Sequence, residues 1–402
     1  MSAAPTYADW RRNQAAVTVA TFVGFTGFTL VMPFLPIYFA DLGVRDPAAI
    51  AIWSGVSLGV TPAITAAMAP IWARVADRYG RKLMVARSLA AFVVIMALMS
   101  IVQAPWQVLA LRLVLGFFAG YGPMAMTMAA ESAPPESMAS AIGWVQTAQR
   151  LGPALGPVIG GALVLTVGLR QGFLIAALVY VLAFLFVVIG YRDPVGAAAS
   201  VRAASPPPAT FAALRRIPEF TLMMGGVFGL QLVDRSFGPI LPLYLGEIGA
   251  PASQIALWSG VLFTTTAGVA AVGNQLTHRV MDRLPVWWIV PGACVVAAAG
   301  ASVFAFAPAL GVLLAASVVF GLGMGVATTT IYTAASRAVD PGSRGVAFGY
   351  LSMAYLAGLA VSPVAAGVIG AMSIRAVFVV DGLGLLTIAA IVWRAHVREE
   401  RA

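Results

Sequence analysis

The chain has 402 residues, of which 60% are hydrophobic and 10% are charged, and its mean hydropathy is +0.92. A soluble domain needs more polar surface than this, so we predict an integral membrane protein. The net charge of +9 does not indicate nucleic-acid binding, because the arginines are scattered at the ends of apolar segments. One cysteine, Cys294, excludes an intramolecular disulfide, and no metal-ligand spacing is present, so we expect no cofactor and no metal.

Twelve apolar segments follow one another along the chain. Each has the ~20 residues that a bilayer span requires, and runs of this length can span lipid only as helices. We therefore predict an all-α integral membrane protein with twelve transmembrane helices. The spans are expected near residues 15–40, 49–73, 83–103, 106–131, 138–166, 171–191, 217–245, 254–278, 285–306, 309–335, 343–371 and 375–396.

The positive charges predict the orientation of these spans. If the N-terminus is cytoplasmic, the outer loops carry only Arg45, Arg170 and Arg375, and most other arginines lie in inner segments. Arg11 and Arg12 precede an apolar run that is too long for a cleavable signal. We expect a multi-pass protein of the plasma (inner) membrane with both termini cytoplasmic.

The sequence also repeats itself at an offset of 205 or 206 residues. IWSG at 52–55 returns as LWSG at 257–260, and further matches keep the same offset. This indicates two six-helix bundles in parallel orientation. The predicted domains are an N-terminal bundle at 1–191, a proline-rich cytoplasmic linker at 192–216 and a C-terminal bundle at 217–402.

The fifth span carries a regular series of small residues. Gly152, Gly156 and Gly160 recur every four residues and share one helix face, and small residues let helices approach closely. Pro157 lacks a backbone donor and should bend the span, beside Gly161. The series indicates either a bend that sets which side of a cavity opens or tight packing alone.

Several ionisable residues fall inside predicted spans, where an unpaired charge is expensive. Asp234 and Arg235 are adjacent in the seventh span, and neighbouring side chains point about 100° apart on a helix, so the two need not pair. Asp381 lies in the twelfth span and Arg112 in the fourth. We treat Asp234, Arg235 and Asp381 as proton-coupling candidates. The alternatives are a self-neutralising pair for Asp234 and a structural ion pair or snorkelling for Arg112.

Three motifs together resemble those of the major facilitator superfamily, in particular its drug/proton antiporter branch. Residues 73–82 resemble the loop motif of the superfamily, although Ala73 and Val75 depart from it. Arg112 with Gly116 resembles the fourth-span motif, and the resemblance implies that Arg112 is a further proton-coupling candidate. The glycine series with its proline matches the antiporter motif of the fifth span. The matching loop residues are Asp77, Arg78, Gly80, Arg81 and Lys82.

The resemblance covers essentially the whole chain and implies the major facilitator fold with a cytoplasmic gate. In that family the loop latches the two halves, with an acid at the end of the fourth span, where Glu131 stands here. The second copy of the loop keeps Asp282 and Arg283 but has Pro285 in place of Gly80. We therefore expect an asymmetric latch that is stronger in the first half.

The resemblance also implies a central cavity lined by spans 1, 2, 4, 5, 7, 8, 10 and 11. Aromatic and weakly polar residues on those spans suit lipophilic or mildly cationic compounds. The candidate cavity residues are Phe25, Phe28, Phe117, Tyr121, Trp144, Gln146, Phe228, Gln231, Tyr332, Tyr350 and Tyr355.

The leading hypothesis is a monomeric secondary transporter that exports lipophilic or cationic small molecules in exchange for protons, by alternating access. The alternatives are a uniporter, importer or exporter of a metabolite such as a sugar or organic acid, or a lipid flippase of the same fold. An enzyme is not expected, because no nucleophile and base are placed together in the spans. One departure matters: residues 14–40 lack the acid that many antiporters carry in the first span, so a proton carrier must lie elsewhere, or coupling is weak or absent.

Overall fold

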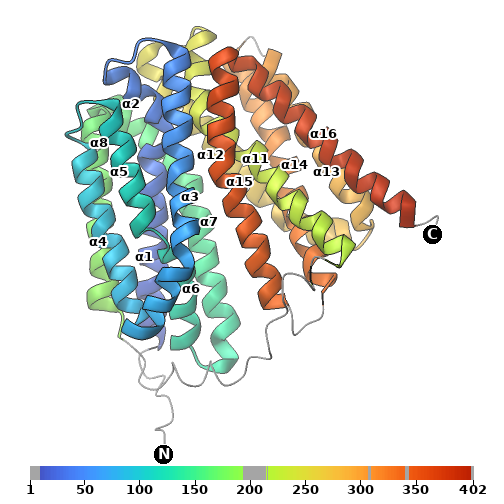
Figure 1. Ribbon diagram of the computed structural model, residues 1–402, viewed down its shortest axis with the longest axis horizontal. Coiled ribbons are helices and arrows are strands. Elements are labelled where there is room, and N and C mark those ends of the chain that lie inside the picture. The colour runs from blue at the N-terminus through green and yellow to red at the C-terminus, as the bar shows by residue number, and fades with distance from the viewer. Residues whose placement is uncertain (1–9, 193–213, 215, 307–308, 340–343, 400–402) are drawn as a thin grey trace, which may run out of the picture. The chain divides into compact units, whose positions relative to one another are not determined.

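The computed structural model describes residues 10–192, 214, 216–306, 309–339 and 344–399, and its long elements are helices (Figure 1). The predicted linker, 192–216, lies almost wholly outside the described residues. The first helices are α1 (Trp10–Val31), α2 (Leu35–Asp41), α3 (Pro47–Tyr79), α4 (Arg81–Met99), α5 (Pro105–Phe118), α6 (Tyr121–Ser132), α7 (Met138–Val167) and α8 (Leu169–Leu185). The later helices are α11 (Pro218–Glu247), α12 (Ile255–Met281), α13 (Val286–Phe306), α14 (Leu310–Arg337), α15 (Arg344–Met372) and α16 (Ile374–Glu399).

Eleven helical segments of the described chain are long and apolar enough to cross a bilayer. Helix α11 is not one of them, because Gln231, Asp234 and Arg235 lower its mean hydropathy. It has 30 residues, however, and is therefore about 45 Å long, more than a bilayer core requires. With α11 included, the described part of the chain has the twelve spanning helices that the sequence predicts.

The contacts divide the chain into two compact units. The first unit comprises residues 1–34 and 64–206, and the second comprises residues 35–63 and 207–402. The break near 206 falls inside the predicted linker. Residues 35–63, which the sequence repeat assigns to the N-terminal bundle, instead group with the second unit by their contacts. Helix α3 therefore contributes its first half to one unit and its second half to the other.

The fourth predicted span is broken into α5 and α6. The break lies at Ala119–Gly120, where Gly120 adopts a φ of 114°, a conformation that residues with a Cβ rarely adopt. Carbonyl oxygens in the last turn of α5 accept hydrogen bonds from Thr65, Trp72 and Arg87 at 3.2, 2.6 and 3.3 Å. Side chains from α3 and α4 thus satisfy backbone groups that a continuous helix would have paired internally.

In the first unit, α1 packs directly against α7 along the glycine face of the fifth span. A Cβ placed on Gly152 would meet the backbone of Phe22 at 2.9 Å. A Cβ on Gly156 would overlap Thr29, and one on Gly160 would overlap the carbonyl oxygen of Leu30. The series therefore lets two helix backbones touch, which is the close approach expected of small residues.

In the second unit, the core is built around aromatic side chains. The ring of Phe237 on α11 lies 5.1, 4.8 and 5.2 Å from those of Phe304, Phe320 and Phe378, which come from α13, α14 and α16. The Tyr244 hydroxyl donates to the carbonyl of Phe304 at 2.6 Å. These contacts fix α11 against three other helices and so position the polar residues in its middle.

The first half of α3 packs against α15 through glycines on both helices. A Cβ on Gly55 would overlap the carbonyl oxygen of Pro363, and one on Gly59 would overlap that of Ala360. From the other side, a Cβ on Gly367 would meet the backbone of Ala51 at 2.6 Å. Backbone contact of this kind explains why residues 35–63 group with the second unit.

Gly160→Ala tests the contact between α1 and α7. The added methyl group falls on the Leu30 carbonyl, so the helices must separate, and we expect a loss of about 1–3 kcal/mol in the free energy of unfolding. Thermal unfolding of the purified protein in detergent measures the loss. Gly143→Ala on the same helix is the control, because a Cβ there meets nothing within 4 Å. Equal melting temperatures for the two variants would contradict the packing.

Candidate functional site

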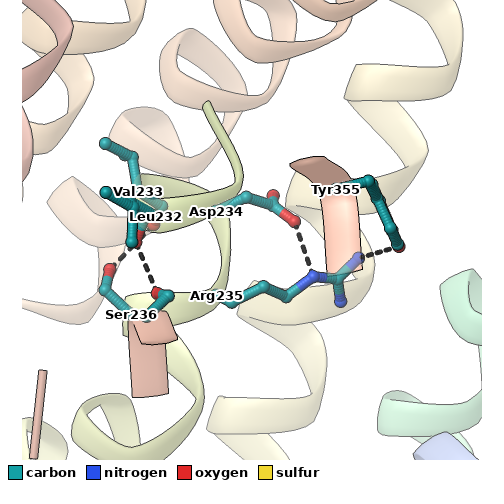
Figure 2. A network of polar contacts seen from close by, with 7 residues as sticks. Leu232, Val233, Asp234, Arg235, Ser236 and Tyr355 are labelled. Carbon is teal, nitrogen blue, oxygen red and sulfur yellow. Dashed lines mark hydrogen bonds and ion pairs between the residues drawn. The ribbon is translucent and has the colours of Figure 1, made fainter. Parts of the chain in front are cut away.

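The middle of α11 carries a polar cluster. Arg235 Nε lies 3.0 Å from Asp234 Oδ2, and Arg235 Nη2 donates to the Tyr355 hydroxyl at 3.5 Å. Figure 2 shows the Asp234 and Arg235 side chains turned towards each other, with Tyr355 on the far side of the guanidinium. The Asp234 side chain is 30% exposed and the Arg235 side chain is 43% exposed. Asp234 and Arg235 therefore pair with each other, and the pair remains partly exposed.

A second acid lies at the contact between α11 and α16. The Asp381 side chain is buried, and its Oδ2 lies 2.5 Å from Ser236 Oγ. The Ser236 hydroxyl also lies 2.7 Å from the carbonyl oxygen of Val233. Ser236 is not a residue that the sequence points to, because a serine in an apolar helix gives no signal of its tertiary partner.

Arg112 lies inside the first unit and is 1% exposed. Its Nη1 approaches Met32 Sδ at 2.6 Å, and its guanidinium lies 5.9 Å from the centre of the Phe28 ring. The arginine therefore points into the bundle and does not snorkel to the membrane surface. A cation over an aromatic face gains some compensation for its lost hydration.

The gate candidates of the first unit lie around the turn between α3 and α4. Gly80 separates the helices with a φ of 93°. Arg81 forms an ion pair with Glu131 at the end of α6, and Lys82 donates to the Tyr191 carbonyl at 2.6 Å. Arg78 is exposed, with its guanidinium 5.4 Å from the ring of the neighbouring tyrosine.

Two further gate candidates lie in the turn that follows α12. Asp282 and Arg283, the second copy of the loop motif, are both exposed. The side chain of Asp77 in the first copy lies outside the described part of the chain. The structure thus joins one acid and one base of the predicted gate, Glu131 and Arg81, within one unit.

The predicted cavity residues fall into three groups by exposure. Tyr121 is buried between Phe25 and Phe92, with ring centres 5.4 and 5.9 Å away, so it belongs to the interior of the first unit. Gln231 is also buried. The exposed members are Phe117, Trp144 and Gln146, and the half-buried ones are Phe25, Phe28, Phe228, Tyr332, Tyr350 and Tyr355.

Arg87 is a polar residue of α4 that the sequence does not connect with the broken span. Its guanidinium stacks on the Trp72 ring, 3.4 Å from the ring centre, while it donates to the last turn of α5. The cation also lies at the negative end of the α5 dipole. A signal for the break is present in the sequence, where Gly120 and Gly122 flank Tyr121 just before Pro123.

Twelve spanning helices, close glycine contacts and a few buried charges define a polytopic membrane protein of the transporter class. The family model of the Major Facilitator Superfamily matches residues 17–285 and 223–402, which together cover most of the chain. The chain therefore belongs to this superfamily and is a secondary transporter.

The chain is similar to multidrug resistance proteins along most of its length. It is 32% identical over 311 residues to Multidrug resistance protein MdtG of Proteus mirabilis, covering 77% of this chain and 75% of that protein. It is also 32% identical over 279 residues to MdtG of Escherichia coli, covering 69% of this chain and 67% of the relative.

Solved transporter structures share the fold at lower identity. A bacterial homologue of the human lysosomal transporter Spinster, inward-facing and unoccupied, has a TM-score of 0.80 and 18% identity, with 97% of each chain covered. The nucleoside transporter NupG has a TM-score of 0.71 and 15% identity, covering 94% of this chain and 98% of its own.

A double-mutant cycle tests the ion pair between Arg81 and Glu131. Each single change, Arg81→Gln or Glu131→Gln, leaves its partly buried partner without the opposite charge, so the double variant should be less destabilised than the sum of the singles. We expect a coupling energy of about 1 kcal/mol from chemical unfolding of the purified protein. Pairing Arg81→Gln with Glu136→Gln, an exposed acid nearby in sequence, should give additive effects. A coupling energy of zero between Arg81 and Glu131 would contradict the ion pair.

Proposed function

We propose that this protein exports lipophilic or cationic small molecules, including drugs, across the plasma (inner) membrane in exchange for protons. The observation that carries the proposal is the 32% identity to MdtG proteins over 69% or more of the chain. The glycine face of α7 supports it, because the motif of drug/proton antiporters here makes a backbone contact with α1.

The chemistry of α11 and α15 suits a weakly polar, positively charged substrate. Asp234 offers a partly exposed carboxylate, and its partner Arg235 contacts the hydroxyl of Tyr355. Aromatic faces and a single acid can attract a lipophilic cation without the dense polar contacts that a sugar would need. Phe228 and Tyr350 add half-buried aromatic surface on the same two helices.

The transport cycle is proposed to be alternating access between the two membrane faces. Proton coupling would use ionisable residues inside the spans, since residues 14–40 contain no acid: Asp234 with Arg235, Asp381 and Arg112 are the candidates. The loop after α3, with Arg81 and Glu131 joined, would act at the cytoplasmic gate. Both termini are proposed to be cytoplasmic, and the protein to act as a monomeric transporter in the bilayer, with no enzymatic activity and no nucleic-acid partner.

Ethidium, a lipophilic cation, tests the proposed function in proteoliposomes with an imposed pH gradient. The purified protein should accumulate ethidium against its gradient on the acidic side, and a protonophore should abolish the accumulation. Empty liposomes are the control. A parallel panel of toxic compounds, tested on cells with and without the gene, defines the substrate range. Transport of a sugar, an organic acid or a lipid in place of ethidium would overturn the proposal.

Asp234→Asn tests the exposed acid of the cluster. The change removes the negative charge while keeping the side-chain shape, so ethidium binding, measured by fluorescence, should persist through its apolar contacts. Accumulation driven by the pH gradient should be lost, because the Asp234 carboxylate that couples cation binding to proton binding is gone. Glu136→Gln, which removes an exposed acid outside α11, should transport normally. Unchanged proton-driven accumulation in Asp234→Asn would contradict this role.

A further inference from the structure

The Ser236 hydroxyl stands between two oxygen atoms. Its Oγ lies 2.5 Å from Asp381 Oδ2 and 2.7 Å from the carbonyl oxygen of Val233. Both distances are in the range of O–H···O hydrogen bonds. A backbone carbonyl and an ionised carboxylate can only accept, and a serine hydroxyl has a single hydrogen to donate.

The arrangement therefore needs one more hydrogen than a serine and a carboxylate possess. If Asp381 were ionised, Ser236 could donate to only one neighbour, and two oxygen atoms without a hydrogen between them would be held in repulsive contact. A protonated Asp381 removes the conflict: its hydroxyl donates to Ser236 Oγ, and Ser236 donates to the Val233 carbonyl. Each contact then has one donor and one acceptor.

The surroundings of Asp381 also favour the neutral acid. The side chain is only 6% exposed, and α16 packs against α11, α13 and α15. Helix α11 carries Asp234 and Arg235 next to Ser236 in sequence, but that arginine is paired with Asp234 and contacts Tyr355. An ionised carboxylate in such a place would lose its hydration without gaining an opposite charge in return, so the neutral acid is favoured.

Few other ionisable groups lie on the helices packed around Asp381. Helix α13 contributes a single thiol, α15 contributes phenols and one terminal arginine, and the ends of α11 and α16 carry the rest. These groups are Cys294 on α13; Arg344 and Tyr350 on α15; Glu219, Tyr244 and Glu247 on α11; and Arg375, Arg394, His396, Arg398 and Glu399 on α16.

We propose that Asp381 and Ser236 form a proton-binding site, in which Asp381 holds the proton that is exchanged for substrate. This use of the site rests on proton-coupled efflux being the function. When the proton leaves to water, the Ser236 hydroxyl turns from the Val233 carbonyl to the Asp381 carboxylate, so one hydrogen bond within α11 is exchanged for a stronger one to α16.

The position of the site links it to the exposed cluster. Asp234 precedes Ser236 by two residues in α11, and Ser236 contacts Asp381. A cation bound beside Asp234 adds positive charge near Asp381 and favours loss of its proton. Conversely, protonation of Asp381 weakens the attraction for the cation. This reciprocity is the coupling that an antiporter requires.

Infrared difference spectroscopy between acidic and alkaline buffer tests the site without any substrate. The wild-type protein should show the carbonyl stretch of a protonated carboxylic acid that disappears at high pH. Asp381→Asn should abolish this band, whereas Ser236→Ala should shift its frequency, because the acid loses its acceptor. Asp234→Asn is the matched control, because it removes the other acid near Ser236, and it should retain the band. A Ser236→Ala shift keeps the test decisive even if Asp381→Asn folds poorly.

Two infrared results would overturn the proposal. One is a band of equal size in the wild-type protein and Asp381→Asn, which would place the protonated acid elsewhere. The other is a band that persists at every pH at which the protein remains folded, which would make Asp381 a permanently neutral structural group.

Ethidium transport then tests whether this proton is the exchanged one. In proteoliposomes Asp381→Asn should lose accumulation driven by a pH gradient but keep exchange of external for internal ethidium, since the amide imitates the protonated acid. Accumulation equal to that of the wild-type protein would overturn the coupling role. If the wild-type protein does not transport ethidium while the band titrates and vanishes in Asp381→Asn, the proposed function fails and the proton-binding site stands.

Discussion

Inside a bilayer every backbone polar group and every charge must find its partner within the protein, and this constraint governs the structure. Helices satisfy most of the backbone automatically. Where the fourth span breaks at Gly120, the carbonyls freed in the last turn of α5 are taken up by Thr65, Trp72 and Arg87 from neighbouring helices. The break is tolerated because two other spans supply donors at the right depth.

The same constraint is met differently by each charge buried in the spans. Arg112 lies against Met32 and the ring of Phe28 inside the first unit. Asp234 and Arg235 neutralise each other while staying partly exposed. Asp381 contacts only a serine hydroxyl among the bonds described for it, so its own proton is the remaining way to neutralise it. A residue that must gain a proton to be stable in one state is suited to release it in another.

The two halves of the chain are related in sequence but not equivalent in structure. Gly120 and Gly325 occupy corresponding positions, 205 residues apart. Gly120 has a positive φ and separates two helices, whereas Gly325 lies within the continuous helix α14, where a Cβ would overlap the backbone of Ala270. One glycine thus provides an unusual backbone conformation and the other a close helix contact. Repetition in sequence therefore does not ensure that corresponding spans bend at the same place.

The sequence alone determined the membrane class, the twelve helices and the residues that are expensive to bury, because hydropathy and charge act locally along the chain. The superfamily was indicated by the resemblance of three motifs. The sequence also indicated that Gly152, Gly156 and Gly160 share a packed face. Only the tertiary structure decided which groups meet: that α1 is the partner of those glycines, that Asp234 pairs with its neighbour, and that residues 35–63 pack with the second unit. Helix rotation and side-chain rotamers set these contacts, and hydropathy does not fix either. For the same reason an inconspicuous serine, Ser236, became part of the candidate site only when α11 and α16 were seen together.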